Sequence, residues 1–255
     1  MLAKPQTMPV HALATLIEME NFGELHNTIR PPVSWFPKMQ RDEINAKVRA
    51  EFAREGLIDG KDRIDDEFAD SLKVLCRAGA EFYGWINDGK ATKGVLAAAI
   101  GREAVLAIRD GASVTLSQIR PESLPEALVA QLPELRPGRG EAMSVLQSEL
   151  SAASPDGRVS TEAGVGSRPA PAAVRVIAQI ADLPTTGTGE LYVAVRDRMG
   201  RRRVSEPPLR YSDTSNGRWL GHAVPTGDDA QVFVAPATPG RLVSRLQEMH
   251  RALTS

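Results

Sequence analysis

The chain contains one sequence pattern twice, a little over a hundred residues apart. Residues 81–88 read Glu-Phe-Tyr-Gly-Trp-Ile-Asn-Asp, and residues 190–197 read Glu-Leu-Tyr-Val-Ala-Val-Arg-Asp. The tyrosine of the second copy, Tyr192, follows the tyrosine of the first, Tyr83, by 109 residues (192 − 83). A repeat of this length indicates a duplicated structural unit, which restricts the fold more than any other feature of the chain.

The spacing between the two copies stays nearly constant along the chain. Gly101 and Gly217 are 116 residues apart (217 − 101), and Pro121 and Pro236 are 115 apart (236 − 121). So small a drift is typical of loop insertions inside a duplicated unit. We therefore expect two strand-rich units, each closed by a helix, that pair into one continuous sheet with pseudo-twofold symmetry. Such a surface suits the binding of another protein and presents no obvious catalytic cleft.

The two units and their elements follow from composition and apolar spacing. We expect one domain, residues 1–255, with an N-terminal unit (9–132), a partly flexible linker rich in Pro, Gly, Ser and Ala (133–171) and a C-terminal unit (172–255). Apolar periodicity predicts helices at 9–19, 41–55, 65–78, 123–132, 172–181 and 239–253, the last with Thr238 as its N-cap. It predicts strands at 82–87, 103–109, 113–119, 190–196, 204–211, 219–224 and 231–235, with 93–99 as a further candidate.

Composition excludes several classes of function. A formal net charge of −1 gives no reason to expect nucleic-acid binding through bulk electrostatics. The single cysteine, Cys76, rules out an intramolecular disulfide and a cysteine metal cluster. The longest apolar run, residues 95–100, is too short to cross a bilayer, and the first residues lack the apolar core of a signal peptide. We therefore expect a cytoplasmic protein with no membrane contact.

The segment from Gly84 to Thr92 nearly matches the spacing of a phosphate-binding loop. In that motif backbone amides surround the phosphates, and a hydroxyl residue after the lysine binds magnesium. Here Lys90 is followed by Ala91, and Gly84 lies within a strand pattern. A hairpin loop with its turn at Gly89 is the favoured interpretation. A nucleotide-binding protein that uses a degenerate form of this loop is the alternative.

The remaining polar clusters also favour structural roles. Five arginines between Arg196 and Arg203 could neutralise phosphates of RNA or DNA, but no aromatic residues interleave them. A hairpin tip whose charges keep an edge strand from aggregating is the preferred interpretation. The histidines are scattered without the spacing of metal ligands, and no nucleophile motif indicates catalysis. We expect no catalytic residue, metal or cofactor, and hence no enzyme.

Residues 213–219, Asp-Thr-Ser-Asn-Gly-Arg-Trp, predict a tight hairpin between two strands. The same run resembles the Asp-Thr-x-x-Gly-Arg-aromatic turn of the EspG family, chaperones of actinobacterial type VII (ESX) secretion. Residues 236–246 resemble the closing helix of that family, and residues 104–121 resemble its first-half hairpin. Residues 193–203 are also similar. The resemblance extends from about Pro9 to Leu253 and fails only in the linker, residues 133–171.

The resemblance implies both a fold and a role. EspG proteins are α+β proteins with a pseudo-twofold fold, in which two helical bundles flank a central, mostly antiparallel sheet. The role implied is that of a cytosolic chaperone that binds the hydrophobic tip of a PPE protein within a PE–PPE heterodimer, or a similar ESX substrate. Covering an exposed apolar patch keeps such a substrate soluble until it is delivered to the secretion system. A monomer and a dimer both remain open.

The resemblance also implies where the partner binds. In the family the partner is held by the sheet, by the loop between the second and third strands and by the C-terminal bundle. On this sequence the loop corresponds to about residues 87–93. The implied partner-binding residues are Asn87, Asp88, Lys90, Ala91, Thr92 and Lys93.

Overall fold

The computed structural model describes residues 4–32, 37–153, 158–160 and 167–255. Its helices are α1 (Val10–Met19), α2 (Lys38–Arg54), α3 (Asp66–Arg77), α4 (Leu124–Val129), α5 (Gln147–Ala152), α6 (Ala172–Ala181) and α7 (Pro239–Thr254). Its strands are β1 (Gln6–Pro9), β2 (Ala80–Asn87), β3 (Thr92–Ile100), β4 (Glu103–Asp110), β5 (Ser113–Gln118), β6 (Met143–Leu146), β7 (Arg158–Ser160), β8 (Ser167–Pro169), β9 (Thr185–Arg196), β10 (Arg202–Val204), β11 (Leu209–Thr214), β12 (Gly217–Thr226) and β13 (Asp229–Pro236).

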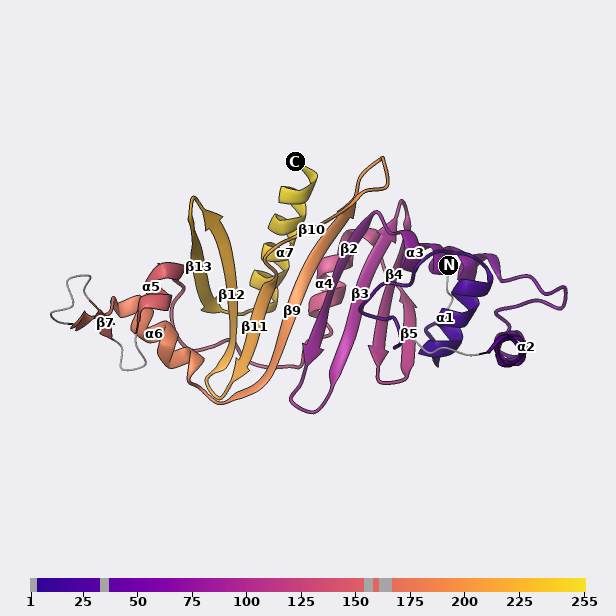
Figure 1. Ribbon diagram of the computed structural model, residues 1–255, viewed down its shortest axis with the longest axis horizontal. Coiled ribbons are helices and arrows are strands. Elements are labelled where there is room, and N and C mark those ends of the chain that lie inside the picture. Colours follow the sequence, from indigo (N-terminus) through magenta and orange to yellow (C-terminus); the bar gives the residue numbers. More distant parts are fainter. Residues whose placement is uncertain (1–3, 33–36, 154–157, 161–166) are drawn as a thin grey trace.

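One large sheet forms the centre of the molecule (Figure 1). Its strands lie in the order β1-β5-β4-β3-β2-β9-β11-β12-β13-β6, and β10 pairs with the end of β9. The paired strands run antiparallel. Figure 1 shows α1, α2 and α3 at one end of the sheet and α5 and α6 at the other. The predicted α+β fold, a mostly antiparallel sheet flanked by two groups of helices, is confirmed.

The two halves meet where β2 pairs with β9. Tyr83 lies directly opposite Tyr192, and the pairing continues from Ala80 opposite Val195 to Asn87 opposite Thr188. A twofold axis between the two tyrosines relates residues of these strands that are 109 positions apart, which is the spacing found in the sequence. The tyrosine rings stack with their centroids 5.3 Å apart and their planes 10° apart. The duplicated motif is therefore the pair of strands that joins the halves.

The halves also share their order of elements. From the centre outward the strands are β2, β3, β4, β5 and β1 in one half, and β9, β11, β12, β13 and β6 in the other. In each half an edge strand leads into a helix, another helix precedes the innermost strand, and a helix follows the last strand of the meander; α2 is an addition in the first half. The cap of the closing helix α7 is the predicted one, because the Thr238 side chain accepts a hydrogen bond from the Arg241 amide.

Residues 133–171 are more structured than the expected linker. They contain β6 and α5, and β6 extends the sheet by pairing with β13. Upstream, Gly138 packs so closely on Trp219 that a Cβ there would lie 2.3 Å from the indole. A four-residue strand shows too little alternation to be recognised in a stretch rich in Pro, Gly and Ser. We propose that the second unit begins at Met143; residues 154–157 and 161–166 lie outside the described part of the chain.

The strand predicted at 204–211 is wrong as a single element. β10 ends at Val204 and β11 begins at Leu209. Pro207 and Pro208 lie between them and have no amide hydrogen, so the ladder of hydrogen bonds cannot continue through them. The candidate strand at 93–99 is confirmed as β3.

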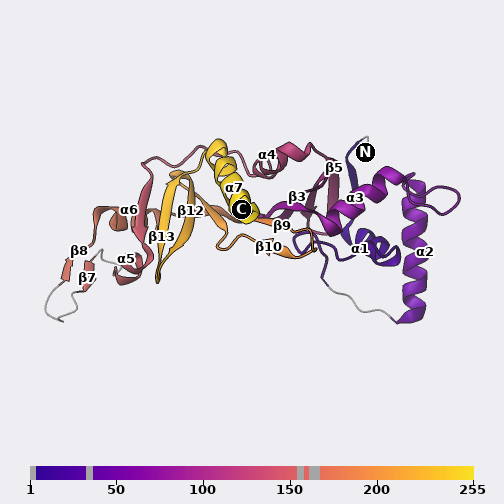
Figure 2. The ribbon, with the colours of Figure 1, turned by 90° about the horizontal axis from the view of Figure 1, so that it is seen from above.

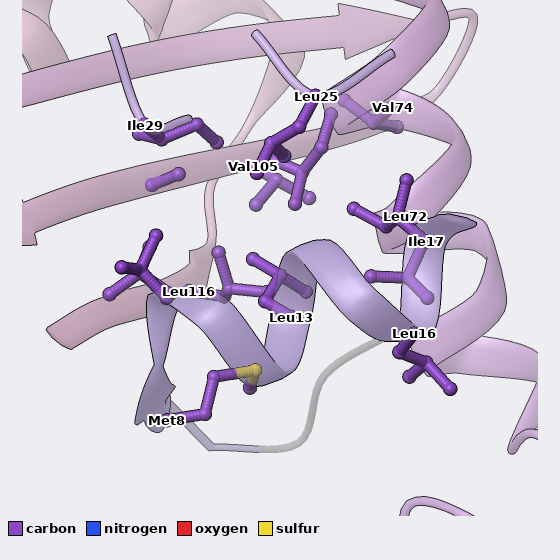
Figure 3. Packing of buried hydrophobic residues seen from close by; sticks show 14 of the residues in the cluster. Met8, Leu13, Leu16, Ile17, Leu25, Ile29, Leu72, Val74, Val105 and Leu116 are labelled. Carbon is purple, nitrogen blue, oxygen red and sulfur yellow. The ribbon is translucent and has the colours of Figure 1, made fainter. Parts of the chain in front are cut away.

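Helices cover the two faces of the sheet in different places. Figure 2 shows α4 and α7 on one face, where they close a core that includes Leu128, Leu191 and Leu246. On the other face α1 and α3 cover the first half. Figure 3 shows this packing, in which Leu13 of α1 lies close to Leu116 of the sheet.

Candidate functional site

The symmetry of the two halves is broken at α6. In the first half, α3 packs against β3 and β4. In the second half, α6 packs against β6 instead, and its Val174 is buried with Val145 and Ala170. This shift moves α6 toward the edge of the sheet. A hollow therefore lies between α6 and the strands β11 and β12.

This hollow, which we name the α6 groove, has an apolar lining. Its volume is about 180 Å³, and it is lined by Ile177 and Ile180 of α6 and by Trp219, Gly221 and Val234 of the sheet, among others. A Cβ added to Gly221 would meet no atom of the described residues within 4 Å. The groove thus offers space for an apolar side chain of another molecule.

The loop between β2 and β3 is shaped by its own side chains. Asn87 Oδ1 accepts a hydrogen bond from the Gly89 amide at 2.8 Å, and Asp88 Oδ1 accepts from the amides of Lys90 at 3.0 Å and Ala91 at 2.9 Å. These amide hydrogen bonds hold the pKa of Asp88 below its usual range. Gly89 supplies the left-handed turn, with φ of 83°.

The predicted partner-binding residues therefore have different surroundings. Asn87 also donates from Nδ2 to Thr92 Oγ1 at 2.8 Å, and Lys93 Nζ lies 3.2 Å from Asp110 Oδ2. Lys90 and Ala91 lie exposed at the tip of the loop. The structure brings the six residues into one loop and its flanking strand ends.

This β2–β3 loop lies next to the α6 groove. Gly89 packs against the Thr186 carbonyl, which a Cβ would approach to 2.3 Å, and Gly187 packs against the Asn87 carbonyl. Both contacts are with the start of β9, where Thr185 lines the α6 groove. The loop and the groove therefore form one continuous surface, where β2 ends and β9 begins.

A polar and aromatic cluster borders this surface. Tyr192 donates from its hydroxyl to Glu190 Oε2, and Arg210 Nε donates to Glu190 Oε1, both at 2.9 Å. These bonds lower the pKa of Glu190, whereas burial and the bond to Glu190 raise the pKa of Tyr192 to about 12. Trp85 meets the Tyr192 ring edge-on, with centroids 6.0 Å apart. Because Arg210 also lines the α6 groove, charged and apolar contacts lie side by side there.

The geometry gives the nucleotide-binding alternative no support. The chain enters a strand at Thr92, whereas a phosphate-binding loop leads into a helix. The amides of Gly89, Lys90 and Ala91 already donate to side chains of the same loop, so they are not directed at a phosphate.

The arginine cluster is largely neutralised within the fold. Arg201 pairs with Asp197 at 2.8 Å, and Arg202 pairs with the buried Glu81 at 2.6 Å. Burial alone would raise the pKa of Glu81, but hydrogen bonds from His26 and Arg202 outweigh it and lower that pKa. Arg203 donates to the Leu253 carbonyl. These contacts fit the predicted hairpin better than a nucleic-acid surface.

The Asp-Thr-x-x-Gly-Arg turn is structural. Arg218 forms a bidentate pair with Asp213 at 2.5 and 2.7 Å, and both side chains are about 95% buried. Arg218 also donates to the Pro133 carbonyl at 2.8 Å, which fixes the chain that leaves the first half. Thr214 Oγ1 donates to the Gly217 carbonyl and closes the hairpin. The motif thus supports the strands beside the α6 groove.

Sequence reasoning missed the α6 groove itself. Its residues come from one helix and four strands, and the sequence does not show that α6 packs on β6 and not on β12. One signal was available: Val176, Ile177 and Ile180 make α6 more apolar than a single buried stripe requires, and Val176 remains 40% exposed.

Two negative findings apply to the described residues. Their His, Cys, Asp and Glu side chains form no group of three or more that could hold a metal ion. No helix in that part of the chain is both long enough and apolar enough to span a membrane.

Comparisons with known proteins agree with this architecture. A solved structure of the Mycobacterium tuberculosis type VII secretion system chaperone EspG5, in complex with the PE25–PPE41 dimer, matches the fold with a TM-score of 0.69 and 17% sequence identity. The match covers 96% of this chain and 95% of that one. No curated protein matches the sequence. The family model of the EspG family matches residues 9–248, and the chain therefore belongs to the EspG family.

Proposed function

We propose that this protein is a cytoplasmic chaperone of type VII secretion that acts by binding and not by catalysis. Its substrate is the hydrophobic tip of a PPE protein within a PE–PPE heterodimer, which it keeps soluble and delivers to the secretion system. Membership of the EspG family supports this role, as does the likeness to EspG5, a chaperone in complex with a PE–PPE dimer. The observation that carries the proposal is the α6 groove, an apolar hollow next to an exposed loop.

The α6 groove suits the chemistry of such a substrate. An apolar side chain from the PPE tip would fill the space above Gly221, between Ile177 and Trp219. Burying a side chain of leucine size contributes about 1.5–3 kcal/mol, which is roughly ten- to hundredfold in affinity. The polar border formed by Glu190 and Arg210 would orient the partner. Because it is charged, it would also keep the unbound chaperone soluble.

The β2–β3 loop would supply the second contact. Its backbone is fixed by Asn87 and Asp88, so little conformational entropy is lost when it binds. We propose that the exposed Lys90, Ala91 and Thr92 touch the partner directly. Lys93, paired with Asp110, would support them.

Filling the α6 groove tests the proposal. We would co-express the chain with a PE–PPE pair encoded beside it and measure co-elution on a size-exclusion column, then Kd by calorimetry. Gly221→Val places a side chain in the groove without a clash at Cβ, and Gly60→Val adds the same bulk at another site where Cβ meets open space. We expect Gly221→Val to weaken binding at least about tenfold and Gly60→Val to leave it unchanged.

Two results would contradict the proposal. One is a failure of the unaltered chain to co-elute with any PE–PPE pair tested. The other is equal affinity of the Gly221→Val and Gly60→Val variants, which would place the partner elsewhere. Circular dichroism of both variants confirms that each is folded.

A further inference from the structure

A second cavity lies on the opposite face of β12 and β13. Side chains alternate between the faces of a strand, so Trp219 and Gly221 face the α6 groove while Leu220 and His222 face α7. The cavity has a volume of about 230 Å³. One wall is formed by the strand residues Leu220, His222 and Phe233, and the other by Arg241, Ser244, Arg245 and Glu248 of α7.

Comparison of the two pseudo-symmetric halves shows that the second half differs from the first at this cavity. His222 follows Gly217 by five residues, as Leu106 follows Gly101, so the two occupy equivalent positions in β12 and β4. Leu106 is buried in the apolar core against the closing helix α4. The second half has an imidazole at this position and an open space beside it.

His222 lines this cavity with a ring nitrogen that the described residues leave unpaired. Its side chain is buried, with 9% of the residue exposed, and Nδ1 has no hydrogen-bond partner among the described residues. The backbone of Pro208 bonds to the ring, and because proline has no amide hydrogen, the ring must donate to its carbonyl. Burial, with the charge of Arg245, lowers the pKa of His222 to about 4, so the imidazole is neutral at pH 7. In this tautomer Nδ1 is an acceptor, so His222 lines the cavity but gives no hydrogen bond to an anion.

The helix wall supplies hydrogen-bond donors. Arg241 donates from Nη1 to the Pro236 carbonyl at 2.9 Å, and Arg245 donates from Nη1 to Glu248 at 2.5 Å. A guanidinium has five N–H donors, so each arginine retains others. Two arginines against Glu248 leave this wall with a net positive charge. The Ser244 hydroxyl lies on the same wall.

The strand wall supplies an apolar surface. Phe233 is 41% exposed and lines the cavity. Leu220 continues this surface into the interior. An apolar wall that faces a donor-rich, positive wall across a space of side-chain size is suited to a molecule with a carboxylate at one end.

We propose that this cavity binds a small organic acid. Its ring or chain lies against Phe233 and Leu220, and its carboxylate accepts hydrogen bonds from Arg241, Ser244 and Arg245. The site is on the face of the sheet opposite the α6 groove, so it does not depend on the proposed chaperone role. Both ligands could be bound at once.

The test is a titration of the isotopically labelled full chain, followed by amide and side-chain NMR. The probes are phenylacetate, benzoate and hexanoate at millimolar concentrations, with phenylacetamide as the uncharged counterpart of phenylacetate. We expect saturable shifts at Leu220, His222, Phe233 and residues 241–245. Phenylacetamide should bind at least about tenfold more weakly, because it lacks the charge that the arginines recognise.

Three variants test whether the cavity is a binding site or only a gap in the packing. Arg245→Gln should lower the affinity for phenylacetate at least about tenfold, and Ser244→Phe, which covers the cavity, should abolish saturable shifts. Arg251→Gln, on the same helix but outside the cavity lining, serves as the control and should bind like the unaltered chain. The proposal is overturned if none of the three acids gives saturable shifts at the cavity. It is equally overturned if the Ser244→Phe variant binds as the unaltered chain does.

Discussion

The buried pair between Arg218 and Asp213 makes the sharpest stability prediction. In the Arg218→Ala variant, the Asp213 carboxylate would remain buried without its partner, and the Pro133 carbonyl would lose a donor. Removing one member of a buried pair costs about 3–5 kcal/mol, because the remaining charge is uncompensated. For a chain of this size that corresponds to a fall in Tm of roughly 6–20 °C.

An exposed arginine–aspartate pair provides the control. Arg63 donates from Nε and Nη2 to Asp59, and its side chain is 72% exposed. Solvent screens such a pair, so we expect Arg63→Ala to change stability little. The assay is urea unfolding followed by tryptophan fluorescence and by far-ultraviolet circular dichroism.

The double variant Asp213→Ala/Arg218→Ala tests the cause of the loss. It removes both charges. The unfolding free energy that it loses should therefore be smaller, by about 1–3 kcal/mol, than the sum of the losses of the two single variants. The reasoning is refuted if Arg218→Ala costs no more than Arg63→Ala. It is also refuted if the single-variant costs simply add.

Three further predictions concern the core, a helix cap and pH. Leu13→Ala, at a fully buried position of α1, should cost about 2–5 kcal/mol in urea unfolding, whereas Met199→Ala at a 78% exposed position should be neutral. Thr238→Ala removes the N-cap of α7 and should cost about 1 kcal/mol in the same assay. The pKa of His222 is lowered from 6.5 to about 4 by burial, so the unfolded chain binds a proton in this window that the folded chain does not. The unfolding free energy should therefore decrease as the pH falls from 6.5 to 4, and His222→Leu should flatten that dependence in urea titrations at several pH values.

Much of the fold could be predicted because the duplication is visible in the sequence. The spacing between Tyr83 and Tyr192 indicated the pseudo-twofold relation, and the structure places these two residues opposite each other at the joint of the halves. The helix at 172–181 was predicted with its observed limits, because a regular apolar stripe defines it. A repeat spacing and an apolar stripe can both be recognised in a single sequence.

The features that depend on contacts distant in sequence could not be predicted. β6 is recognisable as a strand through its pairing with β13, more than eighty residues later. The α6 groove exists because α6 packs on that edge strand. No local sequence pattern indicates that α6 packs there and not on β12. The predicted loop residues 87–93 were found by family resemblance, and their role in binding remains a proposal.

The most direct test of the central claim is hydrogen–deuterium exchange of the chain with and without its PE–PPE dimer. We predict that binding slows exchange in the β2–β3 loop, residues 88–91, in α6 and in β11 and β12 beside the groove. Exchange at the far edge strand β1 should not change. Protection confined to the α7 face of the sheet, with none in α6 or the loop, would contradict the account.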